Sequence, residues 1–300
     1  MTSTRTLNPE PFVTLGVNAM KRRKRTLPRG WYPFDEKDCK REIESYLEGW
    51  SPSQLPPSKG RGGIIPHAGW YFSGRLATRV FYSLASKSKA EVIVLYGGHL
   101  SSGDVPRIVT EEVCETPLGD VETHADFVGN LMKRVEMRKE SPESGDNTIE
   151  IQLTMVKYFF PEAKLVGVRS PLSLKAEILG KEVAAVAKEK GIAILAIGST
   201  DLTHYGPNYG FLRKGVGRAS VEWVKRENDR GFIDQALKMD AEGALKHALE
   251  NDSACSAGAA ISAMATCKAL GSDKGVLLDY YTSYDIMPDD SFVGYAGILY

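Results

Sequence analysis

Three of the five histidines follow directly after apolar runs that predict buried strands. His67, His99 and His204 each stand at the end of, or a few residues beyond, such a run. Because the carboxyl ends of parallel strands meet at one edge of a sheet, we expect these imidazoles to converge there. His124 and His247 fall on predicted helices instead, and we interpret them as ordinary surface or packed residues.

Two further groups could join these histidines. Cys255 lies in Ala-Cys-Ser-Ala-Gly at the start of a predicted helix, where the thiolate form is favoured. Asp201 stands three residues before His204, which would put both side chains on one face if that turn were helical. Each residue alone has an ordinary structural interpretation, such as a helix cap or a small buried thiol. Together they form a set of imidazole and thiolate donors that suits zinc, copper or iron.

The composition narrows the class of protein. The chain has 300 residues with 38 basic and 38 acidic side chains, 42% apolar residues and 25% charged ones. These values are typical of a globular protein and argue against nucleic acid or an anionic membrane as a partner. No apolar run is long enough to span a bilayer, and the first residues predict no secretory signal. The four cysteines contain no CxxC pair, so we expect a reducing, cytoplasmic setting.

The pattern of strands and helices predicts an α/β fold. We expect a single three-layer domain over residues 31–300, with a central, mostly parallel or mixed sheet and helices on both faces. Residues 1–30 are interpreted as an N-terminal extension whose basic run, 21–25, is a solvated stretch or a docking patch. The predicted strands cover 63–65, 91–96, 107–116 (strand or hairpin), 164–168, 192–197, 276–284 and 292–299. The predicted helices cover 36–47, 75–87 with Ser73 as the N-cap, 124–137, 174–190, 221–239, 241–249 and 256–270.

Several of these segments, taken in order, resemble motifs of the Memo family. The resemblance runs from about residue 31 to residue 300, and seven motifs in the right order are more specific than any one of them. The matching segments are Trp31–Pro33, Pro66–Gly74 (PHAGY-x-YSG in the family), Gly97–His99, Thr116–Gly119 (TPLG), Ser199–Gly206 (S-S-D-x-x-H-Y), Cys255 with Gly258, and Val293–Ala296 (VGYA).

The resemblance implies both a fold and a metal site. The family's fold is similar to that of type III extradiol ring-cleaving dioxygenases, which hold non-haem Fe(II). Carried over by position, His67, His99 and Cys255 would bind the metal, Fe(II) first and Cu as the next candidate. Asp201 and His204 would line the same pocket as catalytic groups that orient or carry protons.

The chain departs from the family in one segment. Many members have E-H-S-x-E where this sequence has residues 146–150, and Asn147 stands at the histidine position. Asparagine forms hydrogen bonds but does not titrate near neutral pH. Glu150 remains as a catalytic candidate, although a glutamate in the first turn of a helix often only complements the helix dipole. Cys255 also departs from the usual two-histidine, one-carboxylate iron site.

These features predict an iron-dependent oxidoreductase or dioxygenase-like enzyme acting on a small organic substrate with oxygen. Two alternatives stay open. The chain could be a non-catalytic binding protein that uses the inherited pocket, for a peptide or as a partner of the radical-SAM type. Only Arg75 and Arg107 lie near the motifs, so an anionic peptide is weakly supported. It could also be a metal-free enzyme in which Cys255 attacks, with His67 or His204 as base.

Overall fold

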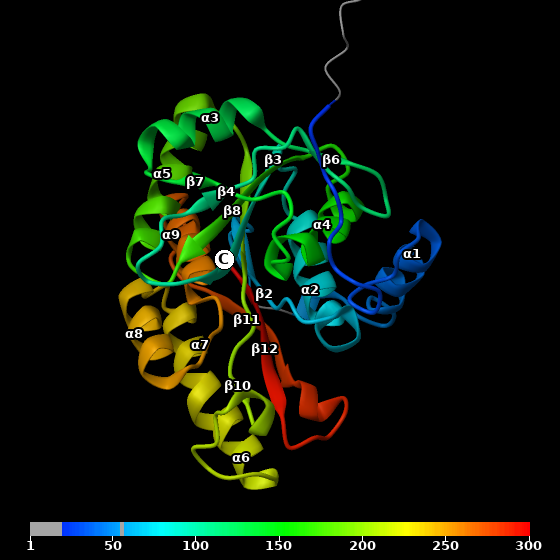
Figure 1. The fold of residues 1–300 in the computed structure, drawn as a ribbon, viewed down its shortest axis with the longest axis vertical. Helices are drawn as coiled ribbons and strands as arrows, with labels where there is room; N and C mark the ends of the chain where they lie inside the picture. The colour runs from blue at the N-terminus through cyan, green and yellow to red at the C-terminus, as the bar shows by residue number, and fades with distance from the viewer. Residues whose placement is uncertain (1–19, 55–56) are drawn as a thin grey trace, which may run out of the picture.

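A large mixed sheet between two layers of helices forms the domain (Figure 1). The computed structural model describes residues 20–54 and 57–300. Within these residues the large sheet contains β2 (Gly62–Ile65), β3 (Val92–Leu100), β4 (Arg107–Ile108), β7 (Arg138–Lys139), β8 (Lys164–Pro171), β9 (Ile194–Ser199), β10 (His204–Tyr205), β11 (Val276–Thr282) and β12 (Phe292–Leu299). A second, smaller sheet contains β1 (Arg22–Arg23), β5 (Val113–Cys114) and β6 (Val121–Glu122).

The middle of the large sheet is parallel, and antiparallel pairs flank it on both sides. The strand order is β10-β12-β2-β9-β3-β8-β4-β7, with β11 paired to the other side of β12. β2, β9, β3 and β8 run parallel, whereas β12 and β4 run antiparallel to their neighbours β2 and β8. The carboxyl ends of three parallel neighbours, β2, β9 and β3, therefore lie at one edge.

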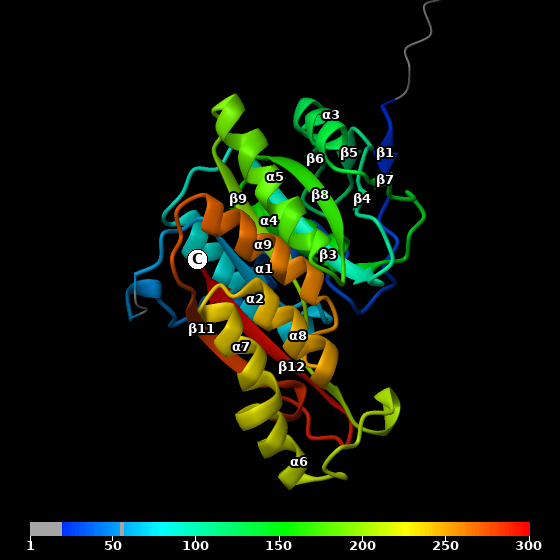
Figure 2. The ribbon, with the colours of Figure 1, turned by 90° about the vertical axis from the view of Figure 1, so that its left-hand side faces the viewer.

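Helices cover both faces of this sheet. They are α1 (Glu36–Ser45), α2 (Trp70–Ala85), α3 (Ala125–Arg134), α4 (Asn147–Phe159), α5 (Lys175–Lys190), α6 (Arg218–Trp223), α7 (Asp229–Leu237), α8 (Ala241–Asn251) and α9 (Ala257–Ala269). Figure 2 shows α5, α9, α7 and α8 on one side of the sheet, while α1, α2 and α4 lie on the other. Among the described residues, no helix is both long and apolar enough to cross a bilayer.

The central strands are apolar on both faces because both faces are covered. Val92, Val94 and Tyr96 of β3 pack in the core beneath α5 and α9. Ile93 and Leu95 point the other way, into the core beneath α2 and α4. This pattern confirms the predicted α/β class, with one sheet between two helical layers.

The small residues of α9 let this helix lie close to the sheet. Residues 257–267 are all buried. A Cβ atom at Gly198 of β9 would lie 2.7 Å from the carbonyl oxygen of Ala259, so a larger residue would push the helix away. The Ala-rich composition of this segment therefore reflects close helix–sheet packing.

Three predicted elements differ from the structure. The helix expected from residue 75 begins at Trp70, because Gly69 is the N-cap and the Trp70 amide donates to the Trp31 carbonyl. Residues 107–116 form two short strands in different sheets, β4 and β5. The single helix expected over 221–239 is interrupted by a π-helical turn at Val224–Asn228, between α6 and α7. The other predicted strands and helices are confirmed to within a few residues.

Part of the predicted N-terminal extension packs onto the domain. Residues 1–19 lie outside the described residues, but β1 pairs with β5. Arg23 and Arg25, within the basic run, are half-buried and pair with Glu111 at 3.8 Å and Glu115 at 3.5 Å. The predicted solvated stretch is therefore wrong for these two arginines, because acidic side chains of the domain face them.

Glu150 of α4 holds the segment that follows this basic run. Its Oε2 accepts hydrogen bonds from the Thr26 amide and hydroxyl, at 2.8 and 2.6 Å. Its Oε1 accepts from the Leu27 amide at 3.0 Å and the Tyr32 hydroxyl at 2.9 Å. The buried carboxylate thus satisfies four donors and fixes residues 26–32 against the domain.

We predict that Glu150→Gln lowers the free energy of unfolding by about 1–3 kcal/mol, because an amide nitrogen cannot accept from the donors that the carboxylate now satisfies. Urea denaturation measures the change, with Glu143→Gln at an exposed position as the control. Equal stability of both variants and the wild-type protein would contradict this structural role.

Candidate metal centre

The predicted ligand residues lie at the carboxyl edge of the parallel strands. His67 follows β2, His99 is the penultimate residue of β3, and Asp201 follows β9. Cys255 lies in the segment between α8 and α9. The ligand atoms of His67, His99 and Cys255 all lie within 4.8 Å of one another. The structure thus brings these three side chains together, as the sequence predicted.

The strand end at His99 has an unusual backbone. His99 has a φ of 59°, in the left-handed region, and the register of β3 with β8 shifts between Gly97 and Leu100. A Cβ atom at Gly98 would lie 2.0 Å from the Ser256 Oγ, so only glycine lets the Cys255 segment lie against β3. The Cys255 amide donates to the Asp201 carbonyl at 3.2 Å, which fixes the segment beside β9 as well.

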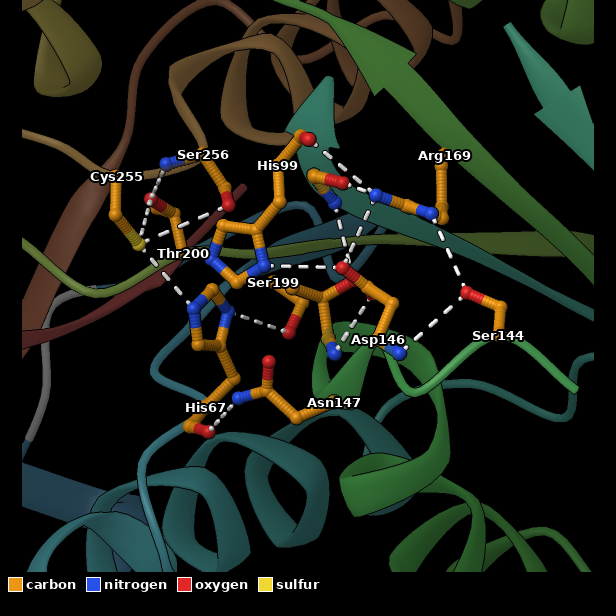
Figure 3. A network of polar contacts seen from close by, with 12 residues as sticks. His67, His99, Ser144, Asp146, Asn147, Arg169, Ser199, Thr200, Cys255 and Ser256 are labelled. Atoms are coloured by element: carbon orange, nitrogen blue, oxygen red, sulfur yellow. Dashed lines mark hydrogen bonds and ion pairs between the residues drawn. The ribbon is translucent and has the colours of Figure 1, made fainter. Parts of the chain in front are cut away.

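Both nitrogens of the His67 ring have a neighbour (Figure 3). Nε2 lies 3.2 Å from the Cys255 Sγ, and Nδ1 lies 3.3 Å from the Ser199 Oγ. The backbone amide of His67 donates to Asp201 at 2.6 Å. Its carbonyl accepts from the Asn147 side chain at 2.9 Å. These contacts leave the fully buried ring little freedom to rotate.

His99 is oriented by a chain of buried charges. Its Nδ1 lies 3.0 Å from the Asp146 carboxylate, which leaves Nε2 for the centre. The Arg169 guanidinium lies 3.2 Å from the same carboxylate and 3.1 Å from Glu140. It also donates to the Gly98 carbonyl at 2.8 Å, and Figure 3 shows it above Asp146. A carboxylate on the outer nitrogen of a histidine is the usual companion of a metal-binding imidazole.

Asp201 and His204 lie beside the cluster, but not on a helix. His204 belongs to β10, which pairs with β12, so the helical turn considered from the sequence is wrong. The Asp201 Oδ2 nevertheless lies 3.9 Å from the Nε2 of both His204 and His67. The His204 Nε2 is buried and has no hydrogen-bond partner among the described residues.

The electrostatics favour a thiolate beside protonated imidazoles in the metal-free protein. Burial alone would raise the pKa of the Cys255 thiol, but the surrounding histidines hold it well below its usual range. Burial alone would lower the pKa of His99 and His204. Their acidic neighbours, Asp146 and Asp201, and the Cys255 thiolate raise each pKa to about 10. In the metal-free protein the protons on the imidazoles balance the charge of the thiolate, and a bound cation could take the place of these protons.

Asp229, a buried aspartate, holds the segment that carries His204 through hydrogen bonds. The Asp229 Oδ1 accepts from the Thr203 amide at 3.0 Å, and its Oδ2 accepts from the Tyr280 hydroxyl at 2.7 Å. A Cβ atom at Gly294 would lie 1.9 Å from Oδ2, so this glycine makes room for the carboxylate. Burial raises the pKa of Asp229 to about 6.

A cavity of about 370 Å³ opens onto His67, His99 and His204. Aromatic side chains form much of its wall, and neither a Lys nor an Arg of the described residues lines it. The lining residues are Trp31, His67, Ala68, Gly69, Phe72, His99, Asn147, Asp201, His204, Tyr209, Ser283, Met287, Asp289, Ser291, Val293 and Tyr295. Its volume lies within the range of small-molecule sites.

The structure does not bring Glu150 into this cavity. Its oxygens are occupied by the N-terminal segment, and a catalytic role for it stays a prediction. The orienting roles of Asp146, Arg169 and Asp229 were missed. A charged residue inside the apolar strand 164–171 was a usable signal for Arg169. Asp229 gave none, because it lies on a helix that resembles a surface helix in sequence.

The remaining histidines and cysteines have structural surroundings. His124 is the N-cap of α3, where its Nδ1 accepts from the Phe127 amide. The Nδ1 of His247 lies 2.8 Å from the Ser253 Oγ. The other three cysteines, Cys39, Cys114 and Cys267, are buried and free.

The raised pKa of Asp229 predicts a pH dependence. The buried Asp229 carboxylate lowers the free energy of unfolding when it is ionised. Protonation removes this effect as the pH falls through about 6 towards 4. Asp229→Asn removes the titration. The stability of wild-type protein relative to this variant should therefore increase, by about 2 kcal/mol, between pH 8 and pH 4.5. Thermal or urea unfolding at both pH values measures it, with the exposed Asp273→Asn as control. A pH-independent difference would refute the assignment.

Comparison with known proteins identifies the family. The family model of Memo-like proteins matches residues 23–299. A MEMO1 family protein of Nitrosopumilus maritimus is 32% identical, covering 93% of this chain and 99% of its own. One from Desulfurococcus amylolyticus is 30% identical, covering 94% and 99%. Among solved structures, an uncharacterized Escherichia coli K12 protein aligns with a TM-score of 0.42 at 11% identity, over 74% of this chain and 91% of its own. On the sequence matches, the chain belongs to the Memo family.

Proposed function

We propose that this Memo-family protein binds a metal ion through His67, His99 and Cys255 and carries out a redox reaction on a small organic substrate. The proposal rests on the position of the three ligand atoms. They lie within 4.8 Å of one another at the carboxyl edge of the parallel strands. Iron is our first candidate and copper our second. Oxygen is the proposed co-substrate.

The residues present fit such an ion. Two imidazole nitrogens and one thiolate suit iron or copper. Ser199 and Asp146 contact the Nδ1 atoms of the two histidines, and both Nε2 atoms remain for the ion. Three protein ligands leave positions for other molecules, as in catalytic rather than structural metal sites.

When bound, the ion would supply redox capacity and polarise the reacting molecule. His204 would hold or release a proton at its buried, unpartnered Nε2. Asp201 would orient His204 and stabilise its charge across 3.9 Å. Asn147 donates to the His67 carbonyl and would position this ligand, but it cannot carry a proton.

The cavity indicates the kind of substrate. Trp31, Phe72, Tyr209 and Tyr295 supply apolar and aromatic surface beside the two histidines. No Lys or Arg of the described residues lines the cavity, and His99 and His204 already face Asp146 and Asp201. A phosphorylated or otherwise strongly anionic peptide would therefore find little unpaired positive charge. This lining favours an uncharged organic molecule over the peptide-binding alternative.

A second candidate function needs no metal. The Cys255 Sγ lies 3.2 Å from the His67 Nε2, which is the arrangement of an activated thiol and its base. A chelator separates the two proposals. A thiol nucleophile keeps its activity after chelation and loses it on alkylation, whereas a metal-dependent reaction stops when the ion is removed.

For the metal proposal, we expect His67→Ala and His99→Ala to lose bound iron while keeping the fold, because each removes one of three ligands. Elemental analysis after purification without oxygen measures about one ion per wild-type chain, and circular dichroism monitors folding. His124→Ala, in a histidine outside the cluster, should retain the metal. Wild-type metal content in both cluster variants would rule out the ligand assignment.

Cys255→Ser should change which metal binds. A hydroxyl is a harder and weaker ligand than a thiolate, so the variant should lose copper(I) more strongly than iron(II). Competition between the two ions, measured by elemental analysis under reducing conditions, gives the ratio. An unchanged ratio and occupancy would show that the sulfur is not a ligand.

A further inference from the structure

A second cavity reaches Cys255 from a side that His67 and His99 do not line. Its volume is about 510 Å³. The lining residues are Leu172, Leu202, His204, Tyr209, Gly210, Phe211, Ala248, Leu249, Asp252, Ala254 and Cys255. Only His204 and Tyr209 also line the first cavity, and their rings contact each other with centroids 4.9 Å apart. This ring pair therefore separates two cavities that adjoin one cluster of reactive groups.

The chemistry of the second cavity differs from that of the first. Within residues 20–54 and 57–300, six of its lining side chains are Leu, Ala or Phe, Asp252 is the one aspartate or glutamate, and no Lys or Arg lines it. Leu249 and Tyr209 are 53% and 47% exposed, large values for apolar and aromatic side chains. A ligand that covered them would remove apolar surface from water. Among the described residues, His204 is the one cationic side chain that lines this cavity, and the Cys255 thiolate and Asp252 offset its charge, so an anion would gain little here.

We propose that this second cavity is a binding site for an uncharged apolar small molecule, in contact with Cys255 and His204. Its volume and apolar lining with a few polar groups are those of small-molecule sites. The site is distinct from the substrate cavity of the proposed function and does not require a bound metal. Its occupant would meet the thiol and His204 from one side, while a substrate meets His67 and His99 from the other.

The test uses N-phenyl-1-naphthylamine, an uncharged apolar dye that fluoresces when shielded from water. The full-length protein, with and without metal, should bind it saturably with one site. Leu249→Asp should weaken binding at least about tenfold, because it replaces apolar surface at the rim by charge. Ile178→Asp, on an equally exposed α5 position that lines neither cavity, should leave the affinity unchanged. Met287→Asp, at the first cavity, should leave it unchanged as well.

A second readout locates the dye. In metal-free protein, iodoacetamide should label Cys255, and saturating dye should slow this labelling in wild-type protein but not in Leu249→Asp. Mass spectrometry measures it, with the three buried cysteines as internal references. Absence of saturable binding, equal affinity of Leu249→Asp, or loss of binding in Met287→Asp would overturn the proposal. Since the labelling uses metal-free protein and dye binding is also measured without metal, failure of the metal centre would not affect this result.

Discussion

The position of the thiol depends on a close contact between two segments that are far apart in the sequence. Ser256 lies against the backbone of Gly98, where a Cβ atom would come within 2.0 Å of its hydroxyl oxygen. The same segment is bonded through the Cys255 amide to the residue that follows the neighbouring strand. Because both contacts involve backbone, the sulfur is fixed relative to two strand ends, and each strand end carries or precedes another group of the site.

Around Cys255, buried charged side chains fix the orientation of the imidazole rings. Asp146 is shared between His99 and Arg169, and Arg169 is shared in turn between Asp146 and Glu140. Burying so many charges is costly unless each is paired and hydrogen-bonded. Here the pairing also fixes the orientation of the His99 ring, so the ion pairs that stabilise the network also set the geometry of the proposed metal centre. Asp229 does the same for the segment that carries His204.

Much of this arrangement could be predicted from sequence, for physical reasons. Apolar runs followed by glycine and histidine predict strand ends, and parallel strand ends converge, so His67 and His99 were expected to meet. Cys255 was a candidate from its place at the start of a predicted helix, and the family resemblance then implied that it is the third ligand. The length of α2 was underestimated because its start depends on the Trp31 carbonyl, a distant contact. Glu150 was read as part of the site, although its partners lie more than 100 residues earlier in the chain. Pairings between residues so far apart produce no local sequence pattern from which they could be predicted.

The most direct test of the central claim is X-ray absorption spectroscopy of the protein loaded with one equivalent of Fe(II) without oxygen. The account predicts one sulfur and two imidazole nitrogens around the ion, with the sulfur signal lost in Cys255→Ser. A coordination shell of oxygen and nitrogen alone in the wild-type protein would contradict it, because the thiolate held between His67 and His99 would then not be a ligand.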